Sequence, residues 1–196
     1  MLVLMVSIMA NLASPCNHRP PAAALEYRMA TTHHPQAKRP SCRILFVCLG
    51  NICRSPTAEG VLRHLAAGEA PRLALDIDSA GTADYHIGAP PDLRSQRAAL
   101  RRGIDISGLR ARQVSKQDFE RFDLILAMDR ENLSELQALK PRDSRAALKL
   151  FLDYAPAVKL CDVPDPYYRD TAAFEEVLDL TTAASRGLLA SLHQSP

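Results

Sequence analysis

A cysteine and an arginine, Cys48 and Arg54, stand in this chain with five residues between them. The apolar run 44–47 precedes the cysteine, and a helix-like pattern over 57–62 follows the arginine. The pair therefore brackets a turn between a buried strand and a helix start. A helix N-terminus attracts a tetrahedral oxyanion through its unpaired N–H groups and its dipole, and a tight loop of amides before it adds an anion-binding nest. The spacing predicts a phosphate-binding loop with a nucleophile at its base.

Each residue type in this loop has a chemical use. The positive field of the loop and the helix stabilises a thiolate, so we expect Cys48 to be a nucleophile. Arg54 offers a planar fork of donors that grips two phosphoryl oxygens and stabilises charge during transfer. Gly50 permits a tight loop, and Ser55 can cap the helix or donate to the thiolate. The alternatives are an inert packed cysteine and a solvated arginine, and the spacing of the two residues argues against both.

The string CLGNICRSP, residues 48–56, resembles the active-site loop of the low molecular weight protein tyrosine phosphatases. Three further segments resemble that family in the right order: DSAGT at 78–82, FDLILAMD at 122–129 and DPYY at 165–168. The resemblance covers roughly residues 42–192. It implies an enzyme that hydrolyses phosphotyrosine through a cysteinyl-phosphate intermediate and needs no metal and no cofactor.

The resemblance assigns the role of general acid to Asp165, which stands in an Asp-Pro pair. A carboxyl group protonates the departing phenol oxygen and then activates the water that releases phosphate. Asp-Pro is also a common turn pair, so the alternative is an ordinary loop aspartate. The expected catalytic residues are Cys48, Arg54 and Asp165.

The resemblance also implies a substrate pocket with aromatic walls. Tyr85 matches a position where the family often has an aromatic residue, and Tyr167 and Tyr168 follow the acid. Such walls favour a phenyl ring, and a deep slot leaves phosphoserine too short to reach the thiolate. The alternative is that these are ordinary half-buried tyrosines. The loop residues expected to contact the substrate are Leu49, Gly50, Asn51, Ile52, Cys53 and Ser55.

Three positions bear on substrate and regulation within the family. Relatives that act on phosphoarginine tend to carry threonine at the position of Ile52, so isoleucine favours phosphotyrosine. In the family, the cysteine at the position of Cys53 can pair with the nucleophile under oxidation, and a small packing residue is the alternative reading. Many relatives carry a histidine near the position of Leu109, which is thought to buttress the loop asparagine, here Asn51. Its absence leaves the support of Asn51 open and points to a weaker activity.

Composition restricts the partners and the compartment. The net charge of the chain is +2, and residues 1–40 hold four basic residues against one acidic residue, so the remainder carries about −1. Without a basic excess, nucleic acid and anionic membranes are poor partners. The five cysteines show neither disulfide-framework nor zinc spacing. A catalytic thiolate needs a reducing compartment, so we expect a cytoplasmic protein, a monomer, whose partner is a phosphotyrosine protein such as a tyrosine kinase.

The first forty residues pose a separate question. Residues 1–13 are apolar, but they are too short to span a bilayer and lack the positive start of a secretory signal. Residues 14–41 are rich in Pro, Ala, His and Arg and are predicted to be disordered. An over-extended start, an organelle or export signal and a functional arm are the alternatives. We therefore expect a disordered extension over 1–41 and a phosphatase domain over 42–196.

Within that domain, short apolar runs alternate with helical patterns, which predicts an α/β fold. We expect one doubly wound domain with a central four-stranded parallel sheet flanked by helices. Strands are expected at 43–47, near 75–79, at 123–128 and near 147–151, and helices over 58–65, 92–102 and 171–192. Ligands bind at the carboxyl ends of the strands in such folds, which is where Cys48 stands.

Three other functions compete with a phosphatase. An arsenate reductase on the same scaffold needs further cysteines in a mobile mid-chain segment, and none lies between Cys53 and Cys161. A non-catalytic phospho-ligand binder needs neither a nucleophile nor an acid, so the presence of both Cys48 and Asp165 argues against it. A redox sensor that uses Cys48 and Cys53 is compatible with a phosphatase.

Overall fold

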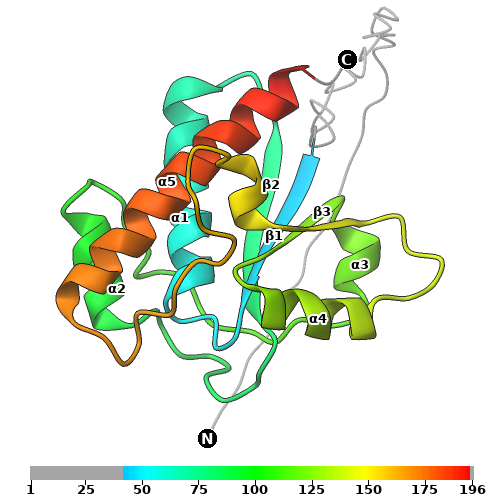
Figure 1. Cartoon of the computed structure of the whole chain (residues 1–196), viewed down its shortest axis with the longest axis horizontal. Coiled ribbons are helices and arrows are strands. Elements are labelled where there is room, and N and C mark those ends of the chain that lie inside the picture. The colour runs from blue at the N-terminus through cyan, green and yellow to red at the C-terminus, as the bar shows by residue number, and fades with distance from the viewer. Residues whose placement is uncertain (1–41, 195–196) are drawn as a thin grey trace, which may run out of the picture. The chain divides into compact units, whose positions relative to one another are not determined.

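A computed structural model describes residues 42–194 of the chain (Figure 1). The expected disorder of residues 1–41 lies outside the described residues. Along the described part the elements are β1 (Cys42–Cys48), α1 (Arg54–Glu69), β2 (Leu75–Gly81), α2 (Leu93–Leu100), α3 (Asp118–Arg121), β3 (Leu124–Ala127), α4 (Arg130–Leu139), β4 (Ala147–Leu150), the 3-10 helix η1 (Phe151–Tyr154) and α5 (Thr171–Gln194).

The four strands form one parallel sheet in the order β2-β1-β3-β4, which confirms the expected α/β architecture. The chain moves outward from β1 to β2 and then returns to the other side of β1 to form β3 and β4. Such a reversal opens a crevice at the carboxyl edge of the sheet, where doubly wound folds bind their ligands. The register pairs Cys48 with Gly81 and Val47 with Ala127, so β1, β2 and β3 end close together at this edge.

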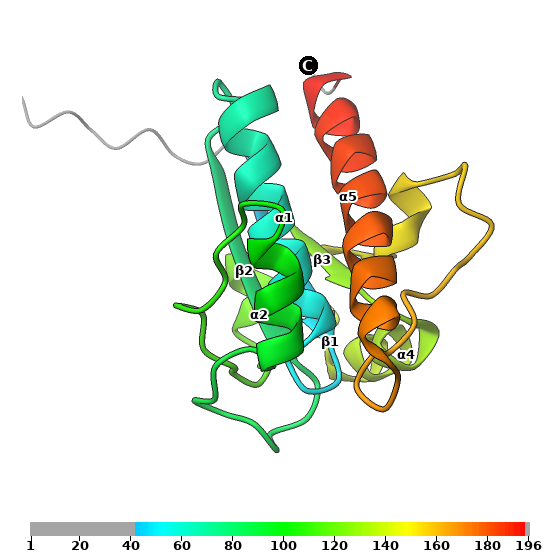
Figure 2. The ribbon, with the colours of Figure 1, turned by 90° about the vertical axis from the view of Figure 1, so that its left-hand side faces the viewer.

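Different helices cover the two faces of the sheet. Phe46 and Leu126 belong to a buried cluster with residues of α1, α2 and α5, whereas Val47 and Ile125 belong to a second cluster with residues of α3 and α4. Figure 2 shows α1 and α5 side by side, with α2 beside them. Because β1 is covered on both faces, it reads in the sequence as a continuous apolar run.

Two kinds of difference separate this structure from the expectations. Residue 151 was expected in the last strand, but β4 ends at Leu150 and Phe151 begins η1. No sequence pattern predicted α3, which has 4 residues, or α4, in which only Asn132 and Leu136 are buried. A helix with so few core positions shows little apolar periodicity. No helix in residues 42–194 is both long enough and apolar enough to cross a bilayer.

Candidate active site

The loop between β1 and α1 is held against the end of β2. Thr82 N–H donates to Cys48 O at 2.8 Å, and Ala83 N–H donates to Leu49 O at 3.0 Å. Gly81 lies so close that a Cβ built on it would stand 2.7 Å from Leu49 O. Only glycine allows this approach of two backbones. The end of β2 therefore holds the loop backbone in a fixed position at the carboxyl edge of the sheet.

Cys48 ends β1 at the base of the loop and is 2% exposed. Its Sγ accepts the backbone N–H of Asn51 at 3.3 Å and lies 3.1 Å from Ser55 Oγ. The Ser55 hydroxyl also reaches Ala80 O at 3.2 Å, so its proton can go to the carbonyl or to the sulfur. When the sulfur is a thiolate, it receives both donors, which is the arrangement a nucleophilic cysteine needs. Ser55 does not cap α1, because it lies inside the helix and points at Cys48.

Arg54 is 4% exposed and is held by two carboxylates and one carbonyl. Its Nη1 donates to Asp129 Oδ2 at 2.5 Å and to Val163 O at 3.2 Å, and its Nη2 donates to Asp165 Oδ2 at 3.0 Å. Burial alone lowers the pKa of Arg54, but the negative charges of Cys48, Asp165 and Asp129 outweigh it and raise that pKa. The guanidinium is therefore a fixed cation with a set orientation beside the loop.

Asp165 lies at the mouth of the site, with its side chain 46% exposed. Besides Arg54, it accepts the backbone N–H of Tyr167 through Oδ1 at 3.0 Å. This bond orients the carboxyl group within a turn, as expected for an Asp-Pro pair. Asp165 is therefore a turn residue and at the same time a residue of the site. The structure thus brings the three expected catalytic residues to one place.

A pocket of about 340 Å³ opens above Cys48. It is lined by Cys48, Leu49, Gly50, Ile52, Cys53, Arg54, Tyr85, His86, Asp165, Tyr167 and Tyr168. Two residues expected to contact the substrate, Asn51 and Ser55, are not part of this lining and are 2% and 0% exposed beneath the loop. Tyr85 and Tyr168 are 75% and 95% exposed, so they are not half-buried as the alternative expected, whereas Tyr167 is half-buried.

His86 is a pocket residue that the sequence did not predict. Its ring lies over the loop, because a Cβ on Gly50 would stand 3.0 Å from His86 Cδ2. The ring centroid lies 6.5 Å from that of Tyr85 and 6.5 Å from that of Tyr167, so it bridges the two aromatic walls. The only signal in the sequence was its place directly after Tyr85.

Cys53 lies in the same loop, is 5% exposed and is a free thiol. Burial raises the pKa of Cys53 to about 12, an effect that the neighbouring Ser95 hydroxyl only partly offsets. Cys53 is therefore protonated near neutral pH and does not compete with Cys48 as a nucleophile. In the described residues, 42–194, no group of His, Cys, Asp and Glu side chains is arranged to hold a metal ion.

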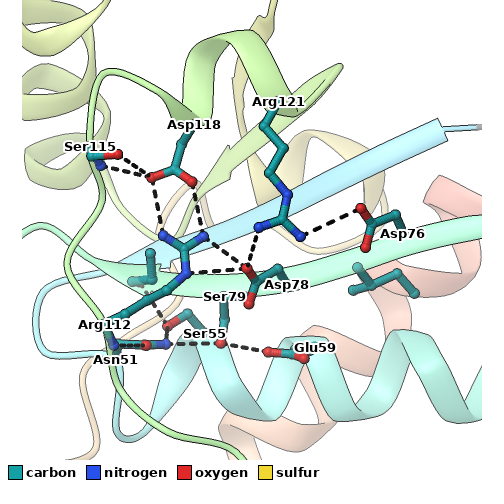
Figure 3. Close-up of polar contacts among 12 residues, drawn as sticks. Asn51, Ser55, Glu59, Asp76, Asp78, Ser79, Arg112, Ser115, Asp118 and Arg121 are labelled. Atoms are coloured by element: carbon teal, nitrogen blue, oxygen red, sulfur yellow. Dashed lines mark hydrogen bonds and ion pairs between the residues drawn. The ribbon is translucent and has the colours of Figure 1, made fainter. Parts of the chain in front are cut away.

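Asn51 is the strained residue of the loop, with a left-handed φ of 54°. Figure 3 shows its side chain joined to a polar network. Its Nδ2 donates to Ser55 Oγ and to Ser79 Oγ, both at 2.9 Å, and its Oδ1 accepts the backbone N–H of Arg112 at 2.9 Å. The histidine missing near Leu109 therefore does not leave Asn51 without support. Neither Ser79 nor Arg112 was predicted to take part.

The network continues to a buried carboxyl group. Ser79 Oγ donates to Glu59 Oε2 at 2.7 Å, and Arg63 pairs with Glu59 Oε1 at 2.8 Å. Because the Ser79 proton goes to Glu59, the lone pairs of the hydroxyl are free to accept from Asn51. Burial raises the pKa of Glu59, and its bonds with Ser79 and Arg63 only partly offset this.

This shift predicts how stability depends on pH at Glu59. Between the ordinary carboxyl value, 4.5, and the raised folded pKa, the folded state holds this proton more tightly than the unfolded state. Ionisation of Glu59 thus lowers stability as the pH rises through this window. Glu59→Gln has no such ionisation. The free energy of unfolding of this variant, relative to that of the native protein, should therefore rise as the pH increases through the window. Urea unfolding of both proteins at a series of pH values measures this, and parallel curves would contradict it.

A family model and two curated relatives describe proteins similar to this chain as low molecular weight phosphotyrosine phosphatases. The family model for "low molecular weight phosphotyrosine protein phosphatase" matches residues 43–195. The protein-tyrosine-phosphatase YfkJ of Bacillus subtilis is 46% identical over 151 residues, which are 77% of this chain and 96% of that protein. The human low molecular weight phosphotyrosine protein phosphatase is 40% identical over 159 residues, 80% of this chain and 99% of the relative.

Solved structures agree with the sequence comparisons. The crystal structure of YfkJ superposes with a TM-score of 0.74 at 44% identity and covers 80% of this chain and 98% of YfkJ. A protein tyrosine phosphatase of Entamoeba histolytica, crystallised with Hepes in the active site, gives a TM-score of 0.75 at 36% identity, with 78% and 97% of the two chains covered.

Proposed function

This chain belongs to the low molecular weight phosphotyrosine protein phosphatase family, a family of hydrolases, and we infer that it removes phosphate from phosphotyrosine in proteins through a cysteinyl-phosphate intermediate. One observation carries the inference: a single pocket holds Cys48, Arg54 and Asp165. Nucleophile, anion-binding cation and proton donor thus face the same small volume.

In the first step, Cys48 attacks phosphorus. The dianionic phosphoryl group enters the loop, where backbone N–H groups and Arg54 hold its oxygens. An S–P bond forms from the thiolate, and the P–O bond to the phenol breaks. The electron pair of that bond goes to the leaving oxygen, which takes the proton of Asp165. Asp165 must carry this proton before the step begins.

In the second step, water releases the phosphate. Asp165, now a carboxylate, takes a proton from a water molecule as the water oxygen attacks phosphorus. The S–P bond breaks, and its electron pair returns to Cys48 as a thiolate. The N–H of Asn51 and the hydroxyl of Ser55 stabilise that thiolate, because both lie within hydrogen-bond reach of Sγ. The enzyme is then back in its starting state.

The pocket walls support an aromatic substrate. Tyr85 on one segment and Tyr167 on another line the pocket together with His86. Tyr167 also packs edge to face on Tyr168, with ring centroids 4.8 Å apart. A phenyl ring between such walls gains stacking contacts that a serine side chain cannot make. Ile52 adds apolar lining at the position that favours phosphotyrosine over phosphoarginine by resemblance.

A reducing compartment such as the cytoplasm suits the free thiols of this site. Peroxide would oxidise the Cys48 thiolate to a sulfenic acid, and the Cys53 thiol would displace water from it to form a disulfide. Reduction by a dithiol would restore both thiols. Because the pKa of Cys53 is about 12, this protection would be slower than one that uses a resolving thiolate.

The function is tested by phosphate release from three matched peptides in EDTA and reductant. We expect the full chain to hydrolyse the phosphotyrosyl peptide much faster than the phosphoseryl and phosphoarginyl peptides. The phosphoseryl side chain is too short to reach Cys48, and the aromatic walls favour the phenyl ring of phosphotyrosine. Faster hydrolysis of the phosphoarginyl peptide would contradict the substrate class. Tight binding of the phosphotyrosyl peptide without phosphate release would indicate a binder, and glutathione-dependent reduction of arsenate would indicate a reductase.

A further inference from the structure

The conformation of Asn51 requires support from outside the loop. A left-handed backbone costs most non-glycine residues roughly 1 kcal/mol or more. Asparagine adopts it more readily than they do, and hydrogen bonds of its side chain help to hold it there. Asn51 has a φ of 54°, and that conformation aims its backbone N–H at Cys48 Sγ, 3.3 Å away. Whatever holds the Asn51 side chain therefore also places the N–H that meets the nucleophile.

Part of this support comes from the backbone of Arg112. Its N–H donates to Asn51 Oδ1 at 2.9 Å, and its carbonyl accepts the N–H of Gly81 at 2.8 Å. Val114 N–H then donates to Gly81 O at 2.8 Å, so the segment around Arg112 extends the edge of β2.

This segment is not a strand of the sheet, and Gly81 and Gln113 form only an isolated bridge. On its other side, Ala111 exchanges backbone bonds with the loop after β2: Gly88 N–H donates to Ala111 O at 2.8 Å, and Ala111 N–H donates to Ala89 O at 2.9 Å. The backbone of the segment is thus paired with the end of β2 and the loop that follows it, but none of these bonds ties it to α3.

The side chain of Arg112 adds bonds to β2 and a link to α3 (Figure 3). Its Nε and Nη2 donate to Asp78 Oδ2 at 3.2 and 2.9 Å, and its Nη1 donates to Asp118 Oδ2 at 3.1 Å. Asp78 belongs to β2 and Asp118 begins α3, so one guanidinium ties two elements together. Asp118 is 5% exposed and also accepts the N–H of Ser115 at 2.7 Å, which fixes the far end of the segment.

The same clamp reaches the second support of Asn51. Asp78, which takes two of the Arg112 hydrogen bonds, precedes Ser79 and accepts its N–H through Oδ1 at 2.8 Å. Ser79 in turn accepts from Asn51. Both long-range partners of the Asn51 side chain therefore stand on backbone that Arg112 holds.

We propose that Arg112 is a positioning residue for the proposed phosphatase reaction: by clamping Asp78 and Asp118 it holds the backbone that fixes Asn51, and through Asn51 it sets the N–H that stabilises the Cys48 thiolate. Arg112 touches neither the substrate nor the reacting sulfur. This inference rests on the proposed function. The side-chain bonds of Arg112 are made with residues outside the lining of the pocket.

The test compares Arg112→Met with Arg121→Met. Methionine keeps the backbone N–H and the apolar stem but loses the clamp. Arg121 is a matched control, because it lies in the same cluster, 3.7 Å from Asp76 and 3.9 Å from Asp78, yet its backbone N–H bonds within the helical turn to Gln117. We expect kcat for a phosphotyrosyl peptide to fall about tenfold in Arg112→Met, as for a catalytic group displaced by a fraction of an ångström. Arg121→Met should stay within twofold of the native chain.

A second readout separates positioning from stability. The rate of Cys48 alkylation by iodoacetamide is followed against pH, and its midpoint should move upward in Arg112→Met but not in Arg121→Met. A loss of stability without a change in the loop would leave this midpoint in place. If Arg112→Met does not fold, Asp118→Asn removes one end of the same clamp and takes its place, with the same expected shift.

A double-mutant cycle tests whether the effect passes through Asn51. Asn51→Gly removes the side-chain bonds and tolerates the left-handed backbone. In that background, Arg112→Met should change kcat less than twofold, because the link is already broken. An equal loss in both backgrounds, or an unchanged midpoint in Arg112→Met, would overturn the proposal. The alkylation needs no turnover, so an inactive native chain would refute the proposed function while this readout still decides the role of Arg112.

Discussion

Replacement of Cys48 by serine should abolish the hydrolysis of phosphotyrosyl peptides, with a loss of about 10⁴-fold or more, as for removal of other enzymatic nucleophiles. Serine is nearly the same size, so the buried loop should keep its geometry. Its hydroxyl stays protonated near neutral pH, and none of the hydrogen-bond partners of Sγ, Asn51 N–H and Ser55 Oγ, is a base. The measurement is phosphate release in EDTA and reductant, with native protein beside the variant.

Two controls make the result of Cys48→Ser specific. The variant should still bind inorganic phosphate with a Kd near that of the native protein, because the loop N–H groups and Arg54 remain. Cys161→Ser, at an exposed cysteine away from the pocket, should keep full activity. Turnover in Cys48→Ser within an order of magnitude of native would refute a cysteinyl-phosphate intermediate.

Replacement of Asp165 by asparagine should have the next largest effect, and one that depends on the leaving group. For phenyl phosphate, whose leaving oxygen is strongly basic, we expect kcat/KM to fall about 10³-fold, within the usual range for a lost general acid. For p-nitrophenyl phosphate the loss should be much smaller, because that phenolate departs without a proton. The kcat/KM ratio reports the first step alone, so slow hydrolysis of the intermediate does not obscure the comparison.

Asp162→Asn is the matched control for this experiment. Asp162 stands in the same loop, but its partner is Arg130, at 2.8 Å, and it lies outside the lining of the pocket above Cys48. The variant should leave both substrates within twofold of native. Equal losses for the two substrates in Asp165→Asn would mean that Asp165 acts by orienting Arg54, which it meets at 3.0 Å, and not as an acid.

These roles separate two kinds of residue around Arg54. Asp129 and Asp165 both bond the guanidinium, but Asp165 is 46% exposed at the pocket mouth and Asp129 is 19% exposed and caps α4 through the N–H of Asn132. The greater exposure of Asp165 suits its proposed role, in which it meets both a leaving group and a water molecule. Asp129 lies outside the lining of the pocket above Cys48 and holds Arg54 through Nη1. The sequence motif 122–129 contained this aspartate, but nothing in it distinguished an orienting carboxylate from a helix cap.

The sequence by itself determined those parts of the molecule that are encoded by residues close together along the chain. The strand 44–47, the loop that follows it and the helix start with Arg54 are contiguous, so residue spacing alone predicts a nucleophile and a cation around an anion site. The positions of the four strands along the chain and the flanking helices α1, α2 and α5 followed from apolar patterns for the same reason. The role of general acid was assigned to Asp165 through the family resemblance, which rests on the Asp-Pro motif. Spacing could not have linked it to Arg54, because the two residues are distant in sequence.

Only the tertiary structure decided how that loop is supported and what surrounds the pocket. Asn51 meets Ser79 and Arg112, which stand 28 and 61 positions away, and His86 comes to lie over Gly50. Such contacts depend on which strands pair and where each one ends, and single residues that hydrogen-bond across the fold leave no periodic trace in the sequence. A missing histidine near Leu109 therefore suggested a weakened site, whereas the fold provides Asn51 with a serine, a clamped backbone amide and a buried glutamate behind them.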